Sequence, residues 1–144
     1  MRVRQFSYGD LPAVCELACN ALKERYAPSL FVNLYSHWPE GFIVVENQGA
    51  IVGFVLGVMV SRIQARILML AVSPSIRRTG IATLLFREFC LACGKKGIRY
   101  LTLEVRKSNV PAIRFYEKMG FRTYGQIDRY YTDGEDAYKM QLFL

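Results

Sequence analysis

The chain has 144 residues, of which 52% are hydrophobic and 22% charged, and its formal net charge is +7. That length suits one domain with a sizeable core, and the ordinary composition excludes a low-complexity or disordered chain. The longest apolar run, residues 50–60, is too short to span a bilayer, and residues 1–10 lack the apolar core of a signal peptide. We therefore expect one cytoplasmic domain over residues 1–144, with no membrane association.

The charge is distributed unevenly. Residues 62–129 contain 14 Lys and Arg against four Asp and Glu. A basic segment of this kind suits an anionic ligand, either a nucleic acid or a polyphosphate cofactor. Charge alone does not choose between these two ligands.

The hydrophobic pattern predicts seven strands and four helices. Asp10 is the expected N-cap of the first helix, and Gly94 or Gly97 is expected to end the third. In chain order we expect strand 3–6, helix 10–22, helix 29–38, strands 41–46, 50–60 and 65–72, helix 80–93, strand 100–105, helix 109–120, and strands 121–131 and 135–144. This order predicts an α/β (α+β) fold, with a mixed, mostly antiparallel sheet crossed by βαβ units near its end and flanked by helices.

Residues 71–89, AVSPSIRRTGIATLLFREF, join an apolar strand to a helix. The first N–H groups of a helix lack intrahelical partners and lie at the positive end of its dipole, so a pyrophosphate fits there. Gly80 and Ala82 leave room for its oxygens, and Arg77 and Arg78 add charge. The Gly-Lys-Ser/Thr of a P-loop is absent, and only one of the three dinucleotide-motif glycines is present. On these residues alone, a plain turn with solvated arginines fits equally well.

Residues 77–82, Arg-x-x-Gly-x-Ala, resemble the coenzyme A motif of the GNAT acetyltransferases, and residues 103–121 resemble the next conserved block of that superfamily. Residues 129–140, RYYTDGEDAYKM, are similar to the ending of the N-terminal protein acetyltransferases, both the RimI-like type and the catalytic subunit of N-terminal acetyltransferase A. Residues 22–31 resemble the first-loop segment of the latter. The resemblance spans nearly the whole chain. It implies the GNAT fold, acetyl-CoA as cosubstrate without a metal, and acetyl transfer to a protein N-terminal α-amine in a ternary complex.

The resemblance also implies which residues contact the coenzyme. They lie at the end of strand 65–72, where a backbone N–H would hold the oxyanion, at the following junction, and in helix 109–120. These residues are Leu70, Ala71, Val72, Arg77, Arg78, Thr79, Gly80, Ile81, Ala82, Asn109 and Tyr116. Asn109 is expected to act as an N-cap as well.

The chemistry needs a proton acceptor for the amine and a donor for the departing thiolate. An α-amine with a pKa of about 7.7–8.0 is partly neutral at pH 7, so a modest acceptor suffices. Glu104 is the first candidate base, since RimI-like enzymes carry a base glutamate in the same LEVR string; Glu24 is the second, or binds the amine. Tyr116 is the expected general acid. The structural alternatives are an exposed Glu104–Arg106 pair, a solvated Glu24 and a core Tyr116.

The peptide groove is assigned by the same resemblance. Tyr130 and Tyr131 are expected to hold the first residues of the substrate backbone, with Leu22, Glu24 and Tyr26 beside them. Because the two adjacent tyrosines fall in a predicted strand, we expect their side chains to point to opposite faces.

Three other functions stay open. One is acetylation of a lysine side chain or a small amine. A second is a ribosome- or RNA-associated binding module without turnover, although the basic residues are scattered rather than interleaved with aromatic ones. The third is a degenerate family member that binds coenzyme A without turnover. Ribosome association and an auxiliary subunit are compatible with catalysis. The four cysteines, Cys15, Cys19, Cys90 and Cys93, are expected to be buried, reduced thiols rather than disulfides or a zinc site.

Overall fold

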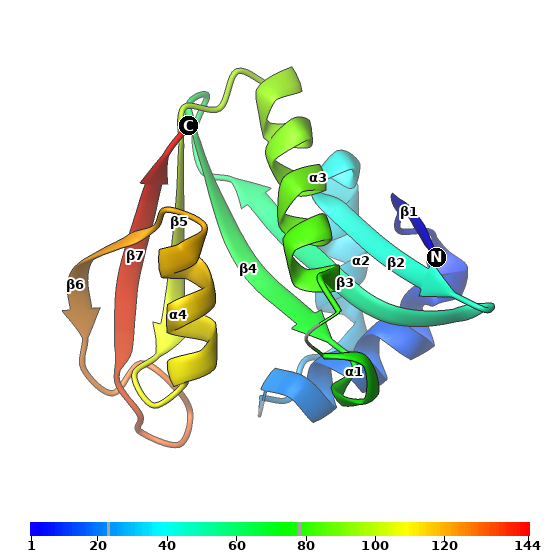
Figure 1. Cartoon of the computed structure of the whole chain (residues 1–144), viewed down its shortest axis with the longest axis horizontal. Coiled ribbons are helices and arrows are strands. Elements are labelled where there is room, and N and C mark those ends of the chain that lie inside the picture. Colours follow the sequence, from blue (N-terminus) through cyan, green and yellow to red (C-terminus); the bar gives the residue numbers. More distant parts are fainter. Residues whose placement is uncertain (23, 78) are drawn as a thin grey trace.

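The computed structural model describes residues 1–22, 24–77 and 79–144. Within these residues, the seven strands and four α-helices follow the predicted order. The strands are β1 (Arg2–Gln5), β2 (Phe42–Asn47), β3 (Ala50–Met59), β4 (Gln64–Val72), β5 (Tyr100–Arg106), β6 (Arg122–Ile127) and β7 (Ala137–Phe143). The helices are α1 (Leu11–Leu22), α2 (Pro28–His37), α3 (Ile81–Lys95) and α4 (Val110–Lys118). All seven strands join one sheet in the order β1-β2-β3-β4-β5-β7-β6 (Figure 1).

Strands β1 to β4 pair antiparallel. The β2–β3 hairpin turns at Gln48 and Gly49, which both have positive φ, as a two-residue hairpin turn of type I′ requires. Leu68 forms a bulge in β4, because Met69 pairs with Leu56 while Ile67 already pairs with Gly57. Bulges bend a strand and increase its twist.

The sheet opens between β4 and β5. These strands run parallel and pair only through Gln64–Arg66 and Tyr100–Thr102. Beyond that point β5 stays paired with β7, whereas the edge of β4 that faces β5 has no strand partner in the described part of the chain. Figure 1 shows the two strands spreading apart toward the ends that lead into α3 and α4. We call the space between residues 67–72 of β4 and 103–106 of β5 the fork.

Helices cover both faces of the sheet. Helices α1 and α2 pack on one face around Phe31, Phe42 and Phe54, and α3 and α4 pack on the other. A Cβ atom at Gly57 would lie 2.4 Å from the ring of Phe89, so glycine allows α3 to lie close to β3. The buried apolar side chains of α3 and α4 belong to one core cluster, which holds both helices on the same face of the sheet.

The prediction that the sixth strand extends to residue 131 is wrong. Strand β6 stops at Ile127, and residues 128–136 form a loop before β7. Arg129 has a positive φ of 50°, and its N–H donates to the Asp136 carboxylate at 2.9 Å, so the chain turns where the aromatic sequence suggested an extended strand.

Asp10 does not cap α1 as expected. It closes a 3₁₀ turn that leads into the helix, and its carboxylate accepts hydrogen bonds from the Ser7 N–H at 2.9 Å and from Arg4 at 2.7 and 2.8 Å. Helix α3 runs through Gly94 and stops before Gly97, which has a φ of +75°. None of the helices in the described ranges is long and apolar enough to cross a membrane.

Candidate active site

The N-terminus of α3 presents backbone groups to open space. Gly80 is its N-cap, with a φ of +85°, and no side chain of the described residues caps the helix there. A Cβ atom at Gly80 would meet no heavy atom of the described residues within 4 Å. Because the first N–H groups of a helix lack intrahelical partners, this end can hold a phosphate-like anion.

The other predicted coenzyme residues at this junction differ in what they offer. Arg77 is exposed and Ala82 is half-buried. The Thr79 hydroxyl donates to a carbonyl of the preceding turn at 2.6 Å. Ile81 is buried in the core, so only its backbone can face a ligand. Arg78 lies outside the described residues.

Leu70, Ala71 and Val72 form the end of β4 beside the fork. They pair with β3 on one side only. On the other side, the backbone of β4 beyond Arg66 is not paired with β5. An N–H group on that edge is available to a developing negative charge in the fork.

Glu104 projects from β5 and forms an ion pair with Arg66 of β4, and its side chain is only 14% exposed. The Tyr130 hydroxyl accepts a hydrogen bond from Arg66 at 2.8 Å and donates one to Glu104 at 3.2 Å. The alternative in which Glu104 pairs with Arg106 on an exposed face is therefore wrong. Arg106 is engaged elsewhere.

Arg106 is the centre of a second polar cluster. Its Nη1 donates to Asp133 at 2.8 Å and to Glu135 at 3.0 Å, and its Nη2 donates to Glu24 at 3.1 Å. The guanidinium carbon lies 4.1 Å from the centre of the Tyr131 ring. Burial opposes its charge, but the hydrogen bonds to Glu135 and Asp133 outweigh burial and raise the pKa of Arg106.

Glu24 links two loops that are distant in sequence. Its Oε1 accepts the Thr132 N–H at 3.3 Å, and its Oε2 accepts the Thr132 hydroxyl at 2.8 Å. The side chain is 13% exposed, so the alternative of a solvated loop charge is wrong. With both oxygens already bonded, Glu24 holds the loop after α1 against the loop 128–136.

The tyrosine pair does not follow strand alternation. Tyr130 and Tyr131 lie in the loop 128–136 with ring centres 5.0 Å apart. Tyr130 contacts Glu104 and Tyr131 stacks on Arg106, two residues on the same face of β5. The prediction that the two rings point to opposite faces is wrong. Burial raises the pKa of both tyrosines.

Leu22 and Tyr26 are the two other residues predicted to form the peptide groove. Leu22 ends α1 and packs at the margin of the core beneath α1 and α2. The ring of Tyr26 contacts Phe31 edge-on, with centres 6.1 Å apart. Burial, reinforced by the nearby charge of Glu24, raises the pKa of Tyr26. Leu22 and Tyr26 therefore flank Glu24, each at a distance of two residues along the chain.

Tyr116 of α4 belongs to the buried core, as the core alternative expected, with its ring centre 5.4 Å from that of Phe121; its role as general acid stays a prediction. Burial raises the pKa of its phenol, and the neighbouring Tyr131 adds to the effect. The hydroxyl is therefore protonated at neutral pH. Asn109 caps α4 as predicted, since its Oδ1 accepts the Ala112 N–H at 3.2 Å; its coenzyme contact stays a prediction.

Arg66, Arg106 and Thr132 were not among the predicted site residues. Arg66 had a visible signal, because it is the one charged residue in the apolar segment 65–72. Arg106 alternates with Glu104 on the polar side of β5 and could have been read in the same way. Thr132 has no local signal.

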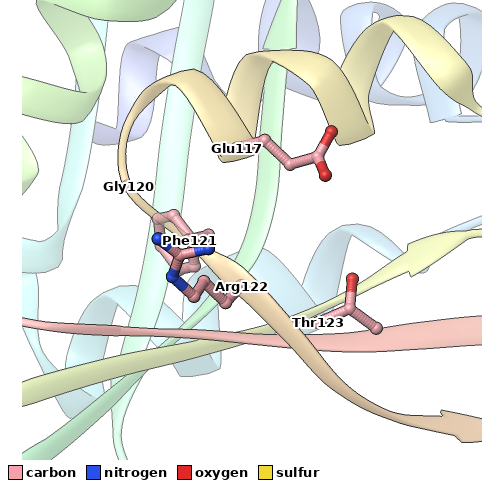
Figure 2. Close-up of a pocket in the computed structure, with 5 residues that line it drawn as sticks. All are labelled: Glu117, Gly120, Phe121, Arg122 and Thr123. Atoms are coloured by element: carbon pink, nitrogen blue, oxygen red, sulfur yellow. The ribbon is translucent and has the colours of Figure 1, made fainter.

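Two hollows of the surface are lined by residues outside the predicted site. One, of about 320 Å³, is lined by Glu117, Gly120, Phe121, Arg122 and Thr123. Figure 2 shows Glu117 and Thr123 pointing into the space between the end of α4 and β6. Another, of about 410 Å³, lies against Lys107, Ser108, Gly134, Glu135 and Asp136. Neither contains a predicted site residue, and we place the candidate site on the geometry of the fork.

The cysteines are free thiols. Cys93 is buried, which raises its pKa to about 12, but Cys19 is exposed, contrary to the expectation that all are buried. The cysteines of α1 and α3 lie on opposite faces of the sheet and cannot form one site. The described residues contain no group of three His, Cys, Asp or Glu side chains that could hold a metal. The absence of a metal requirement stays a prediction.

The fold and the site agree with the comparison to known proteins. A profile of the family described as Acetyltransferase (GNAT) matches residues 11–121. An uncharacterized N-acetyltransferase of Methanocaldococcus jannaschii is 41% identical over 97% of this chain and 90% of its own length. A Bacillus subtilis protein described as a putative ribosomal protein bS18 alanine N-acetyltransferase is 33% identical over 94% of this chain and 90% of its own.

Solved structures give the same answer. The crystal structure of Ard1 from Thermoplasma volcanium has a TM-score of 0.97 and 38% identity, covering 99% of this chain and 97% of that one. Naa20 of Chaetomium thermophilum, solved with a bisubstrate analogue, has a TM-score of 0.90 and 29% identity, covering 100% and 87%. The chain belongs to the GNAT acetyltransferase family. The predicted family, fold class and acetyltransferase activity are confirmed.

Proposed function

We propose that the chain is one domain over residues 1–144 that transfers acetyl from acetyl-CoA to the N-terminal α-amine of proteins. The observation that carries this proposal is the position of Glu104. It lies in the fork, between the unpaired edge of β4 and the two joined loops, and is held by Arg66 and Tyr130. Relatives named as an N-alpha-acetyltransferase and as a putative ribosomal protein bS18 alanine N-acetyltransferase support the same substrate class.

The N-terminus of α3 fits the diphosphate of the cosubstrate. Gly80 leaves its backbone accessible, and in the described part of the chain the helix has no side-chain cap that an anion would have to displace. Arg77 adds positive charge at the same junction, as does Arg78 in the sequence. When bound, acetyl-CoA supplies an activated acetyl thioester.

The residues at the fork then divide the proton transfers. Glu104 accepts the proton that the amine loses, directly or through one water. An N–H of residues 70–72 donates to the carbonyl oxygen as negative charge develops on it. Tyr116, protonated because burial raises its pKa, donates to the departing sulfur.

The two loops form the substrate wall. Leu22 is the last residue of α1 and Tyr26 lies in the loop after it, whereas Tyr130 and Tyr131 lie in the loop 128–136. Glu24 joins these loops through Thr132. We propose that this wall holds the first residues of the substrate backbone, and that the protein acts in the cytoplasm on nascent or ribosomal proteins.

A peptide panel tests the proposal. The protein is incubated with acetyl-CoA and short peptides that differ in their first two residues, and with one N-terminally blocked peptide that contains a lysine. Mass spectrometry should find acetyl on free α-amines and none on the blocked peptide. Acetylation of the lysine would instead favour a side-chain enzyme. No product, together with salt-dependent RNA binding that survives substitution of residues 77–82, would favour a binding module.

A further inference from the structure

Arg66 bridges the fork. It is the last residue of β4 that pairs with β5, where it lies opposite Thr102. Its guanidinium forms the ion pair with Glu104 and donates to the Tyr130 hydroxyl at 2.8 Å. Strand β4, strand β5 and the loop 128–136 therefore meet at one carboxylate.

The contacts of Glu104 are concentrated on one of its oxygens. Arg66 and Tyr130 both contact Oε1. No hydrogen bond or ion pair between the described residues uses Oε2. Arg66 and Tyr130 therefore fix the orientation of the carboxylate and leave Oε2 as the acceptor for a ligand.

The other charged groups near Glu104 do not replace Arg66. Lys139 lies opposite Glu104 on β7, but its Nζ lies 4.9 Å from the ring centre of a β6 tyrosine. Arg106, two residues further along β5, is paired with three other carboxylates. The remaining titratable neighbours, Tyr130 and Tyr131, are uncharged at neutral pH because burial raises their pKa. In the described part of the chain, the ion pair of Glu104 is thus made by one cation.

We propose that Arg66 makes the site select the neutral form of the substrate amine. This inference rests on the proposed function and concerns how the same site chooses its substrate. A carboxylate already balanced by a guanidinium gains little from an incoming ammonium, whereas its free oxygen accepts an N–H from a neutral amine. At pH 7 about a tenth of α-amines are neutral, against less than about a thousandth of lysine side chains. Arg66 is therefore a positioning residue that favours protein N-termini over lysines.

Proton release on binding tests this inference directly. A short peptide with a free N-terminus is titrated into the CoA-loaded protein at pH 6.5, by calorimetry in two buffers of different ionisation enthalpy. The wild type should release about one proton per peptide, because most of the peptide is ammonium before binding. Arg66→Gln should release less than about half a proton, since the ammonium can then pair with Glu104. Arg66→Lys should restore release, and Arg62→Gln, at an exposed turn residue, should behave as the wild type.

Kinetics give a second measurement. Below the pKa of the peptide amine, the apparent KM of the wild type should rise about tenfold for each pH unit by which the pH is lowered, and this slope should flatten in Arg66→Gln. A merely structural role would raise KM by one factor at every pH and leave the slope unchanged. Equal slopes, or equal proton release in wild type and Arg66→Gln, would overturn the inference.

The wild type alone is also decisive. If peptide binding releases no proton at pH 6.5, the ammonium is the bound form and the inference is wrong, even when Arg66→Gln cannot be purified folded. A wild type that acetylates no peptide N-terminus contradicts the proposed function instead, so the two failures are distinguishable.

Discussion

The N-terminus of α3 and the loop cluster around Arg106 are built in opposite ways. At α3, binding capacity comes from backbone groups and from a missing side chain at Gly80. At Arg106, it comes from paired side chains that join the loop after α1 to the loop 128–136. Ligand binding at the N-terminus of α3 should therefore be sensitive to an added bulky side chain and to few other changes. The second region, around Arg106, should respond to the loss of single polar groups, because each one leaves a charged partner without its bond.

The largest effect is expected from bulk at α3. Gly80→Trp should abolish measurable acetyl-CoA binding, a loss of at least about a hundredfold, because two or more charge-assisted contacts become unreachable. Gly97→Trp is the matched control, since Gly97 also has a positive φ and open space around it but follows the other end of α3. Calorimetric titration with acetyl-CoA gives both affinities. Equal losses in the two variants would mean that backbone strain, and not the site, is responsible.

Tyr116→Phe should separate chemistry from coenzyme binding at α3. Turnover is expected to fall about ten- to a thousandfold with little change in coenzyme affinity, since only the donated proton is lost. Tyr124→Phe, at an exposed position, is the control. Steady-state rates and an affinity measurement check both numbers. Unchanged turnover would remove Tyr116 from the mechanism.

Breaking the second region at its centre should cost both stability and substrate binding. Arg106→Gln is expected to lower the free energy of unfolding by about 2 kcal/mol, less than for a fully buried pair because Asp133 is largely exposed. The KM for peptide should rise about tenfold while coenzyme affinity is retained. Urea unfolding and peptide kinetics measure these changes. A variant with normal peptide KM would show that the cluster does not shape the groove.

The stability that Arg106 contributes through its carboxylate partners depends on pH. Hydrogen bonds from the Glu135 N–H and from Arg106 lower the pKa of Asp133, and contacts with Ser108 and Arg106 lower the pKa of Glu135. Carboxyls with a lowered folded-state pKa contribute stability above their unfolded pKa, near 4, and lose it as the pH falls through the folded value. The stability difference between wild type and Arg106→Gln should therefore shrink between about pH 5 and pH 3. A constant difference in unfolding scans would contradict this.

The smallest effect is expected from Thr132→Val, which removes one hydroxyl donor to Glu24. Stability should fall by about 1 kcal/mol, and the peptide KM should rise a few-fold. Thr123→Val, on the exposed face of β6, is the control and should change neither. An effect on coenzyme affinity would show that the two regions are coupled.

The two regions also differ in how well the sequence predicts them. The Gly80 junction could be predicted because strand end, turn, glycine and helix start lie within about ten residues and carry their own geometry. The Arg66–Glu104 pair could not, because these residues are distant in the chain and meet only through the short parallel pairing of β4 with β5. The polar face of β5 was visible in the alternation of Glu104 and Arg106, but alternation does not name partners across the sheet.

The loop 128–136 shows why one prediction failed. Tyr130 and Tyr131 have the composition of a strand, but the Asp136 carboxylate and the positive φ of Arg129 turn the chain there. Contacts of this kind override β-propensity, which reflects packing more than backbone preference. The same loop brings Thr132 to Glu24, a contact for which the sequence offers no pattern.

The most direct test is a crystal structure of the protein with an analogue that joins coenzyme A to a short peptide. We expect the diphosphate within hydrogen-bond distance of the backbone N–H groups that follow Gly80, and the peptide N-terminus beside Glu104, under the tyrosines of the loop 128–136. A diphosphate bound away from the start of α3, or a peptide that enters the fork without approaching Glu104, would contradict this account.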